Sequence, residues 1–249
     1  MIKIENLYKY FDGREILHDI SCEFESGKTN LIIGQSGSGK TVLMKCLIGL
    51  YEAEKGNILY DNRNFIKMVK KDRQILQQEM GVLFQGGALF DSMSVKENVL
   101  FPLIMLSNLN ESERNDRAEF CLERVNLQDS QHLYPSQISG GMKKRVAIAR
   151  SIALNPKYLF CDEPNSGLDP KTSLIIDELI YELTHEYQMT TIINTHDMNS
   201  VMAIGETVSF IHEGKLWWKG SKNEILNTDN DELNSFVYAS KFAQHLKRK

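Results

Sequence analysis

A glycine-rich stretch near the start of the chain has the residue types and spacing that bind phosphate. It reads Gly34-Gln35-Ser36-Gly37-Ser38-Gly39-Lys40-Thr41 and lies between a short apolar run and a helical pattern. Glycines let the backbone approach an anion closely, so that backbone N–H groups and the helix N-terminus face the phosphate oxygens. In this motif, the P-loop, the Lys40 ammonium reaches the β- and γ-phosphates and the Thr41 hydroxyl binds Mg²⁺. The alternative is a glycine-rich turn without a ligand.

Two adjacent carboxylates follow a second apolar run. Asp162 and Glu163 come directly after Tyr158-Leu159-Phe160-Cys161, a run that is typical of a buried strand. This order puts Asp162 at the carboxyl edge of a parallel sheet, where open α/β folds bind ligands. There Asp162 would hold Mg²⁺ through water, and Glu163 would polarise the water that attacks the γ-phosphate. Acidic strand ends are common, so this prediction depends on the P-loop that accompanies it.

A serine and two glycines open a helical run between these two motifs. Ser139, Gly140 and Gly141 precede Met142-Lys143-Lys144-Arg145, and a helical pattern continues from Val146 to Leu154. At a helix N-terminus such a group forms a second cradle for an anion. Locally it is also an ordinary helix cap, and without the other motifs the cap is the better interpretation.

The elements that must position these motifs alternate between strands and helices. Short apolar or β-branched runs near the N-terminus predict a small β lobe that leads into a buried strand, and the pattern changes to a helix from Thr41. A mainly helical lobe follows over residues 86–157, with a polar helix from about Glu111 to Val125. The α/β pattern then returns, and it ends in a hairpin. The predicted strands are Ile2–Tyr10, Ile16–Phe24, Asn30–Ile33, Tyr158–Cys161, Thr190–Asn194, Thr207–Ile211 and Leu216–Lys219, with a crossover helix over Lys171–Tyr187.

The C-terminal segment, from Glu224 onward, has a weaker pattern. Phe236, Ala239, Ala243 and Leu246 recur there at helical spacing. We predict a docked amphipathic helix that packs on its own domain or contacts a partner or the other subunit.

Composition limits the classes of protein to which the chain can belong. The 249 residues are 42% hydrophobic and 25% charged, as in an ordinary soluble globular protein. The formal net charge of −4 argues against a nucleic-acid binder. The longest nearly continuous apolar stretch, Val99–Leu106, is far shorter than the roughly 18 residues that span a bilayer. The four cysteines are scattered and the N-terminus does not read as a signal peptide, so we expect a cytoplasmic protein.

Three further motifs accompany those already described, and their order is specific. Gln85 follows a short apolar run, Asp169 ends Ser166-Gly167-Leu168-Asp169, and His196 lies in Thr195-His196-Asp197. With the P-loop and the Ser139 segment, this order resembles that of ABC-type ATPase subunits over nearly the whole chain. The fold that the resemblance implies is α/β, a P-loop NTPase (RecA-like) core with an N-terminal antiparallel β lobe and an inserted helical subdomain. Residues 1–249 would form one domain, with the core over 1–85 and 158–222, the helical subdomain over 86–157 and a helical tail over 223–249.

The resemblance implies a role for each motif residue. ATP and Mg²⁺ are the expected cofactors, and the catalytic residues would be Glu163, Gln85 and the γ-phosphate sensor His196. Thr41, Gln85 and Asp162 would surround the metal, and Gln85 would also couple nucleotide state to the helical lobe. Phe11 matches the aromatic residue that stacks on adenine, although its ring could instead belong to the core of the β lobe. The ATP-binding residues would be Phe11, Gly34, Gln35, Ser36, Gly37, Ser38, Gly39, Lys40, Thr41 and Val42.

The family also explains why one chain carries two anion cradles. In a head-to-tail dimer, the signature residues Ser139, Gly140, Gly141 and Met142 of one copy would close on the ATP of the other copy, with Asp169 as the D-loop residue. The implied partners are a second copy of the chain and integral-membrane permease subunits, and not a nucleic acid. The chain would then lie at the cytoplasmic face of the inner membrane, attached through the permease.

Finer features resemble the ATP-binding subunits of the Mla/MCE phospholipid transport systems. Met142 stands where glutamine is usual, and residues 85–95 resemble the region of such subunits that receives the coupling helix of the permease. Ala88, Leu89, Phe90 and Met93 would offer apolar anchors in that exposed loop. The resemblance implies phospholipid transport together with an MCE-domain lipid-binding protein.

Two other functions remain open. An ABC ATPase for another cargo, such as a small solute or a lipoprotein, would share every catalytic residue named above. A non-transport ABC protein that acts on chromosomes, ribosomes or iron–sulphur assembly is disfavoured, because the chain has one nucleotide-binding domain, no heptad insertion and no broad basic face. Co-occurrence with a membrane permease would discriminate between these functions.

Overall fold

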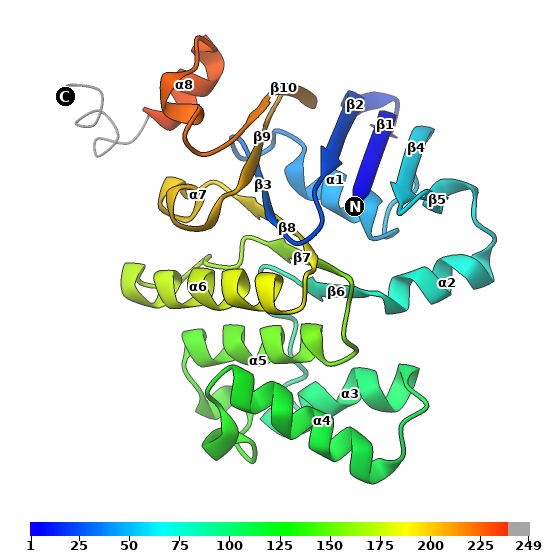
Figure 1. Ribbon diagram of the computed structural model, residues 1–249, viewed down its shortest axis with the longest axis vertical. Helices are drawn as coiled ribbons and strands as arrows, with labels where there is room; N and C mark the ends of the chain where they lie inside the picture. The colour runs from blue at the N-terminus through cyan, green and yellow to red at the C-terminus, as the bar shows by residue number, and fades with distance from the viewer. Residues whose placement is uncertain (239–249) are drawn as a thin grey trace.

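The computed structural model describes residues 1–238, which form two sheets and the helices around them. Figure 1 shows the smaller sheet at one end, the larger sheet in the middle and a group of helices at the other end. The part of the C-terminal prediction that concerns Ala239, Ala243 and Leu246 lies outside the described residues.

The larger sheet carries the motifs. Its strand order is β10-β9-β3-β8-β7-β6, and all neighbours pair in parallel except β9 and β10. Every residue of β3, β7 and β8 is buried, as the apolar and β-branched composition of these strands predicts. The bounds are β3 Thr29–Ile33, β6 Met80–Leu83, β7 Tyr158–Asp162, β8 Thr190–Thr195, β9 Thr207–His212 and β10 Lys215–Gly220.

The smaller sheet is antiparallel, in the order β2-β1-β4-β5. It packs on helix α1 (Lys40–Leu47), whose Leu43 and Leu47 share a core cluster with Ile2 and Ile4 of β1. Ile32 of the larger sheet belongs to the same cluster, so α1 lies between the two sheets. The bounds are β1 Ile2–Phe11, β2 Arg14–Phe24, β4 Lys55–Tyr60 and β5 Arg63–Asn64.

The opposite face of the larger sheet is covered by a second core cluster. Leu31 and Ile33 face this cluster whereas Ile32 faces the first one, as the alternation of side chains along a strand requires. The covering helices are α5 (Gly140–Ile152), α6 (Pro170–Glu186) and α7 (Met198–Ile204). Burial on both faces makes β3 a rigid base for the P-loop that follows it.

The helical group contains α3 (Val95–Leu106), α4 (Glu111–Arg124) and α5, which pack on one another. Capping boxes fix the starts of the first two helices, with Ser94 and Glu97 on α3 and Asn110 and Glu113 on α4. The other helices are α2 Lys70–Gln78 and α8 Asp231–Val237, with 3-10 turns at Phe65–Lys67, Gln128–Ser130, Pro135–Gln137 and Ile225–Asn227. Among residues 1–238, no helix has the length and apolar composition needed to cross a membrane.

Every strand predicted from the sequence is confirmed, with ends that agree to within two residues. The structure adds β4 and β5 to the smaller sheet, β6 to the edge of the larger one, and the helices α2 and α7. The sequences of these elements lack a strong periodic pattern of apolar residues. In α2 a single residue, Leu76, is buried, and β6 contains Gly81, where a Cβ atom would lie 2.3 Å from the carbonyl oxygen of Ser151.

Candidate active site

The P-loop begins where β3 ends, and two neighbouring segments brace it. Gly34 has a φ of 150°, and a Cβ atom there would lie 2.1 Å from the carbonyl oxygen of Ile211, so no other residue fits. The N–H of Gly214, in the turn between β9 and β10, donates to the carbonyl oxygen of Ser38 at 3.0 Å. Because α1 starts at Lys40, its first N–H groups point back into this braced loop.

Lys40 is the buried cation of the loop. Its side chain extends along the loop, and Nζ donates to the carbonyl oxygens of Gly34 and Gln35 at 2.8 and 2.9 Å. Burial lowers the pKa of Lys40, and the carboxylates of Glu163 and Asp162 oppose that shift. The ammonium is therefore held at the loop, within the field of both acidic residues.

Asp162 connects the end of β7 to the P-loop. Its Oδ1 atom accepts hydrogen bonds from the Thr41 hydroxyl at 3.3 Å and from the Asn194 amide at 3.1 Å. Asp162 and Asn194 are partners in the register of β7 and β8, which places the two side chains together. Two buried oxygens nearby, Ser38 Oγ and Asn194 Oδ1, have no hydrogen-bond partner among residues 1–238.

Glu163 and His196 form a pair on neighbouring strand ends. His196 Nδ1 lies 2.7 Å from Oε2 and 2.9 Å from Oε1 of Glu163. Glu163 has a φ of 49°, and its N–H donates to the carbonyl oxygen of Asn194 at 3.0 Å. The Glu163 side chain is 16% exposed and that of His196 is 64% exposed. The pair is thus open on the histidine side and fixed on the glutamate side.

Gln85 follows β6 and contacts the segment after Glu163. Its Nε2 atom donates to the Ser166 hydroxyl at 3.2 Å, so its side chain is hydrogen-bonded to this segment and not to Thr41 or Asp162. Its carbonyl oxygen accepts a hydrogen bond from Lys144 Nζ. The role of Gln85 as a metal ligand stays a prediction.

Lys144 is a residue that the sequence reasoning missed. It is buried in α5, and Nζ also lies 3.5 Å from the carbonyl oxygen of Glu163. Burial lowers the pKa of Lys144, which Cys161, Glu163 and Asp162 oppose. Its spacing of four and seven residues from Ile148 and Ser151 on the buried face of α5 was the available signal.

The signature residues lie at the exposed start of α5. Ser139 caps this helix, and its Oγ accepts a hydrogen bond from the N–H of Met142 at 3.2 Å. At Gly141 a Cβ atom would lie 2.7 Å from Cγ2 of Thr172 in α6, so glycine permits close packing of the two helix starts. Within residues 1–238, no hydrogen bond or ion pair joins residues 139–142 to the P-loop.

Asp169 caps α6 beside the signature. Its carboxylate accepts hydrogen bonds from the Thr172 hydroxyl and from the N–H groups of Lys171 and Thr172. These bonds, with the Thr172 hydroxyl first, lower the pKa of Asp169. The residue is exposed, so the loop that it ends is available at the surface.

Phe11 lies at the end of β1, beside the turn to β2. Its ring is 37% exposed and packs edge-on against Tyr51, with ring centroids 5.1 Å apart. Lys9 Nζ lies 4.8 Å from the ring centroid. The ring is therefore a surface group and not part of the buried core of the β lobe.

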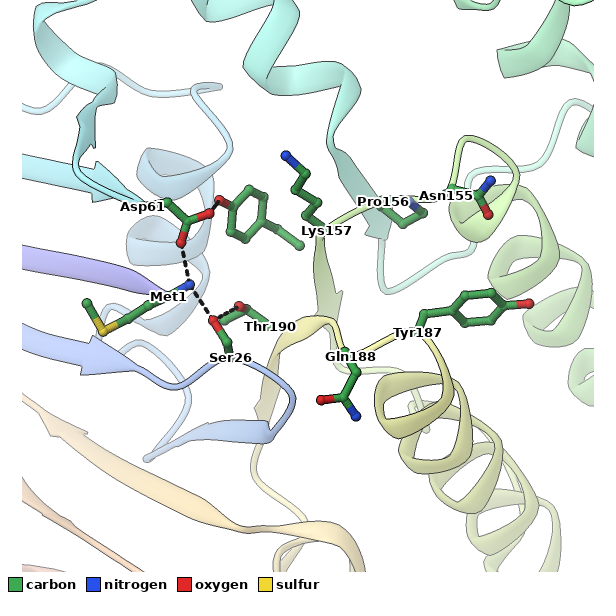
Figure 2. A pocket seen from close by; sticks show the side chains of 10 residues that line it. Met1, Ser26, Asp61, Asn155, Pro156, Lys157, Tyr187, Gln188 and Thr190 are labelled. Atoms are coloured by element: carbon green, nitrogen blue, oxygen red, sulfur yellow. Dashed lines mark hydrogen bonds and ion pairs between the residues drawn. The ribbon is translucent and has the colours of Figure 1, made fainter.

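A cavity of about 280 Å³ lies at the other edge of the larger sheet. It is lined by residues that precede or start strands, among them Ser26, Lys157 and Thr190 (Figure 2). Asp61 bonds the Tyr158 hydroxyl at 2.5 Å in the same place. None of the predicted site residues lines this cavity, since all the motifs that follow strands lie at the carboxyl edge.

Comparison with known proteins identifies the family. The family model described as "ABC transporter" matches residues 17–166, which run from β2 through the P-loop and the signature to Ser166. The chain belongs to the ABC transporter family. This ABC ATPase is an ATP hydrolase, and the fold predicted for it is confirmed.

Curated relatives of the ABC ATPase carry the names of transport proteins. It is 34% identical over 236 residues to a probable ribonucleotide transport ATP-binding protein of Mycobacterium leprae, covering 95% of this chain and 68% of the relative. It is 38% identical over 229 residues to the methionine import ATP-binding protein MetN of Desulfitobacterium hafniense, covering 90% and 67%. The ABC ATPase thus spans about two thirds of the length of both relatives.

Solved structures share its fold. The ATP-binding cassette MJ0796, described as a dimer in a post-hydrolysis state with ADP and Pi, has a TM-score of 0.80 at 29% identity, covering 89% of this chain and 99% of that one. CbiO1 of Clostridium perfringens, described as part of the ABC transporter complex cbiONQ, has a TM-score of 0.86 at 29% identity, covering 99% and 98%. These matches do not identify the cargo, so the resemblance to phospholipid transport systems stays a prediction.

Proposed function

We propose that two copies of this chain hydrolyse ATP at composite sites and so power a membrane permease. The observation that supports this most directly is the Glu163–His196 pair at 2.7 Å, next to the Asp162–Thr41 contact and the P-loop. In this proposal Glu163 takes the proton of the attacking water while the β–γ phosphoanhydride bond breaks. His196 contacts the γ-phosphate and reports its loss.

Magnesium would be held by the oxygen atoms of Thr41, Asp162 and Gln85. The donor set fits, because Mg²⁺ prefers oxygen ligands and keeps several waters. Two buried oxygens without partners among residues 1–238, on Ser38 and Asn194, support a polar ligand here. Bound Mg²⁺ would neutralise phosphate charge, whereas Lys40 and the P-loop N–H groups would orient the phosphates. The Gln85 side chain would have to leave Ser166 to join this set.

The signature would complete the site of the other copy. Ser139 and Gly140 are exposed at the N-terminus of α5, where N–H groups favour an anion. The cassette MJ0796, with the same fold, is described as dimeric. Asp169, exposed beside the signature, would lie at the same interface as the D-loop residue.

Phe11 would contact the adenine base of the bound nucleotide. Phe11, whose ring is exposed, would stack on adenine, beside Val42 and the P-loop.

We propose residues 1–85 and 158–222 as the nucleotide-binding core, 86–157 as the helical subdomain and 223–249 as the tail. The two hydrophobic clusters on either face of the larger sheet support one continuous domain.

The permease would dock on the helical side of Gln85. Phe90 is 41% exposed, and Ile104 and Met105 at the end of α3 are 56% and 63% exposed. Asn98 fixes this loop, since its amide bonds both the N–H and the carbonyl oxygen of Phe90. Leu89 is partly buried and packs against the core, so it is less exposed than Phe90.

For the cargo, we propose phospholipid carried with an MCE-domain partner, with this chain on the cytoplasmic face of the inner membrane. The proposal is supported by the resemblance of residues 85–95 and of the signature with Met142. The second candidate is a small solute, because the relatives are named for ribonucleotide transport and methionine import.

The test is to identify what co-purifies from native membranes with tagged Glu163→Gln protein in the presence of ATP. A permease together with an MCE-domain protein would support the phospholipid proposal. A permease with a solute-binding partner would support the second candidate, and soluble partners without a permease would contradict both.

A further inference from the structure

A buried carboxylate lies beneath the catalytic segment. Asp177 of α6 is 1% exposed, and its Oδ1 atom accepts a hydrogen bond from the side-chain amide of Asn165 at 2.8 Å. The same amide nitrogen lies 3.1 Å from the hydroxyl of Ser200 in α7, which is also 1% exposed. We call Asn165, Asp177 and Ser200 the buried triad.

The triad joins three segments that are separate in the sequence. Asn165 is two residues after Glu163, and Ser200 is four residues after His196. Asp177 lies between them on the buried face of α6, and Figure 1 shows α6 and α7 side by side. One amide group therefore connects the segment of Glu163 to the segment of His196.

Other hydrogen bonds also hold the segment of Glu163. The N–H of Glu163 bonds the carbonyl oxygen of Asn194, and the Ser166 hydroxyl accepts from Gln85. Between these points, the side-chain amide of Asn165 donates to Asp177 Oδ1 in the core and also lies within hydrogen-bond distance of the Ser200 hydroxyl. Loss of Asp177 would leave this partly buried amide with the Ser200 hydroxyl as its remaining acceptor.

Asp177 is an unusual choice for this position. Burial, which hydrogen bonds from Ser200 and Asn165 oppose, raises the pKa of its carboxyl to about 6, with smaller contributions from the charges of Asp197 and Glu178. Within residues 1–238, no lysine, arginine or histidine forms an ion pair with it. An apolar residue would fill α6 at lower cost, because an unpaired buried carboxylate is unfavourable.

We propose that Asp177 is a positioning residue that holds Asn165 against Ser200 and thereby sets the geometry of the Glu163–His196 pair. The inference rests on the proposed roles of Glu163 and His196. The carboxylate touches neither the reacting atoms nor the P-loop. It acts through the backbone between Glu163 and Ser166.

The experiment compares ATP hydrolysis by the full-length chain, with its co-purified membrane partners, for the parent, Asp177→Ala, Asp177→Asn and Ser200→Ala. Asparagine keeps an oxygen acceptor of the same size, whereas alanine removes it. Thr184→Val is the matched control, because Thr184 is a buried polar residue of the same helix that bonds Ile180 and Thr191 far from the triad. Glu163→Gln is measured beside them.

We expect Asp177→Ala to lower kcat about tenfold with KM for ATP changed less than about twofold, as loss of a positioning bond predicts. Asp177→Asn should restore kcat to within about threefold of the parent, and Thr184→Val should leave it unchanged. Hydrogen exchange should accelerate in peptides over residues 163–169 and 196–204 of Asp177→Ala, and this readout serves also if turnover is too low to measure.

Parental kcat in Asp177→Ala, or equal losses in Asp177→Ala and Thr184→Val, would overturn the inference. If Asp177→Ala does not fold, the same comparison is made with Ser200→Ala, which removes the other contact of the amide. If Glu163→Gln hydrolyses ATP at the parent rate, the proposed function fails. If Glu163→Gln is inactive while Asp177→Ala and Ser200→Ala both have parental kcat, the inference alone fails.

Discussion

Glu163 occupies a left-handed backbone conformation with a φ of 49°, which is uncommon for a residue with a side chain. Its N–H is bonded to Asn194, and its carboxylate is bonded to His196 at 2.7 Å. These contacts aim the carboxylate out of the carboxyl edge of the sheet. The nearby Asp162 is buried and bonded to Thr41 and Asn194, so two adjacent carboxylates have different surroundings and suit different roles.

The first prediction concerns this carboxylate. Glu163→Gln should bind ATP as the parent does. Its rate of hydrolysis should be lower by about a hundredfold or more, because the amide is a poor base. Lys40→Ala should instead lose productive ATP binding. Turnover and nucleotide binding are measured together, with the exposed Glu182→Gln as the matched control. Turnover of Glu163→Gln equal to that of Glu182→Gln would remove Glu163 from the role of general base.

At the scale of elements, the ends of strands and the starts of helices carry the site. The register of β7 and β8 places Asp162 beside Asn194, and α5 supplies both the exposed signature and the buried Lys144. Lys144 bonds the carbonyl oxygens of Gln85 and Glu163 from inside the protein. Through this side chain, a rotation of α5 would reach both segments at once.

Lys144→Met should therefore lower turnover about tenfold with little change in ATP affinity, because methionine keeps the apolar stem and removes the donor of both bonds. Lys143→Met is the matched control, since Lys143 is the exposed neighbour in the same helix. The measurement is kcat and KM for the two variants and the parent. Equal kinetics in both variants would show that the buried ammonium does not support the site.

The Asp177 carboxyl also predicts a pH dependence of stability. Its pKa is raised from 3.8 to about 6 in the folded chain, so the unfolded state releases this proton at lower pH. Ionisation therefore destabilises the fold above pH 6, and the effect is relieved as pH falls through 6. Asp177→Asn should be more stable than the parent at pH 8, and this advantage should shrink by roughly 1 kcal/mol at pH 5. Urea unfolding at both pH values checks this, and an advantage that does not change with pH would contradict it.

At the scale of the whole molecule, the P-loop lies at the carboxyl edge of the larger sheet and the signature lies at the start of α5, with no hydrogen bond or ion pair between them in residues 1–238. In the proposed function, a second copy of the chain would bring its signature to this P-loop and complete the site. Phe90, Ile104 and Met105 leave apolar surface exposed, and in the proposed function the permease would dock there.

The sequence predicted the motif-bearing strands well, because β3, β7 and β8 are continuous apolar runs that are buried on both faces. It did not predict α2 or β6, since each has few buried residues and depends on tertiary packing. The P-loop contacts follow from local spacing, whereas the burial of Lys144 had only the weaker signal of its spacing from Ile148 and Ser151. The buried triad could not be predicted from the sequence either, since Asn165, Asp177 and Ser200 come into contact only in the folded chain.

The central claim, a site shared between two copies, is tested most directly by the turnover and ATP binding of Ser139→Arg. The large cation would stand where the signature meets the nucleotide of the other copy, while the P-loop of the same chain is untouched. The proposal predicts ATP binding equal to that of the parent and turnover lower by about a hundredfold or more. Turnover at the parent rate would contradict the shared site.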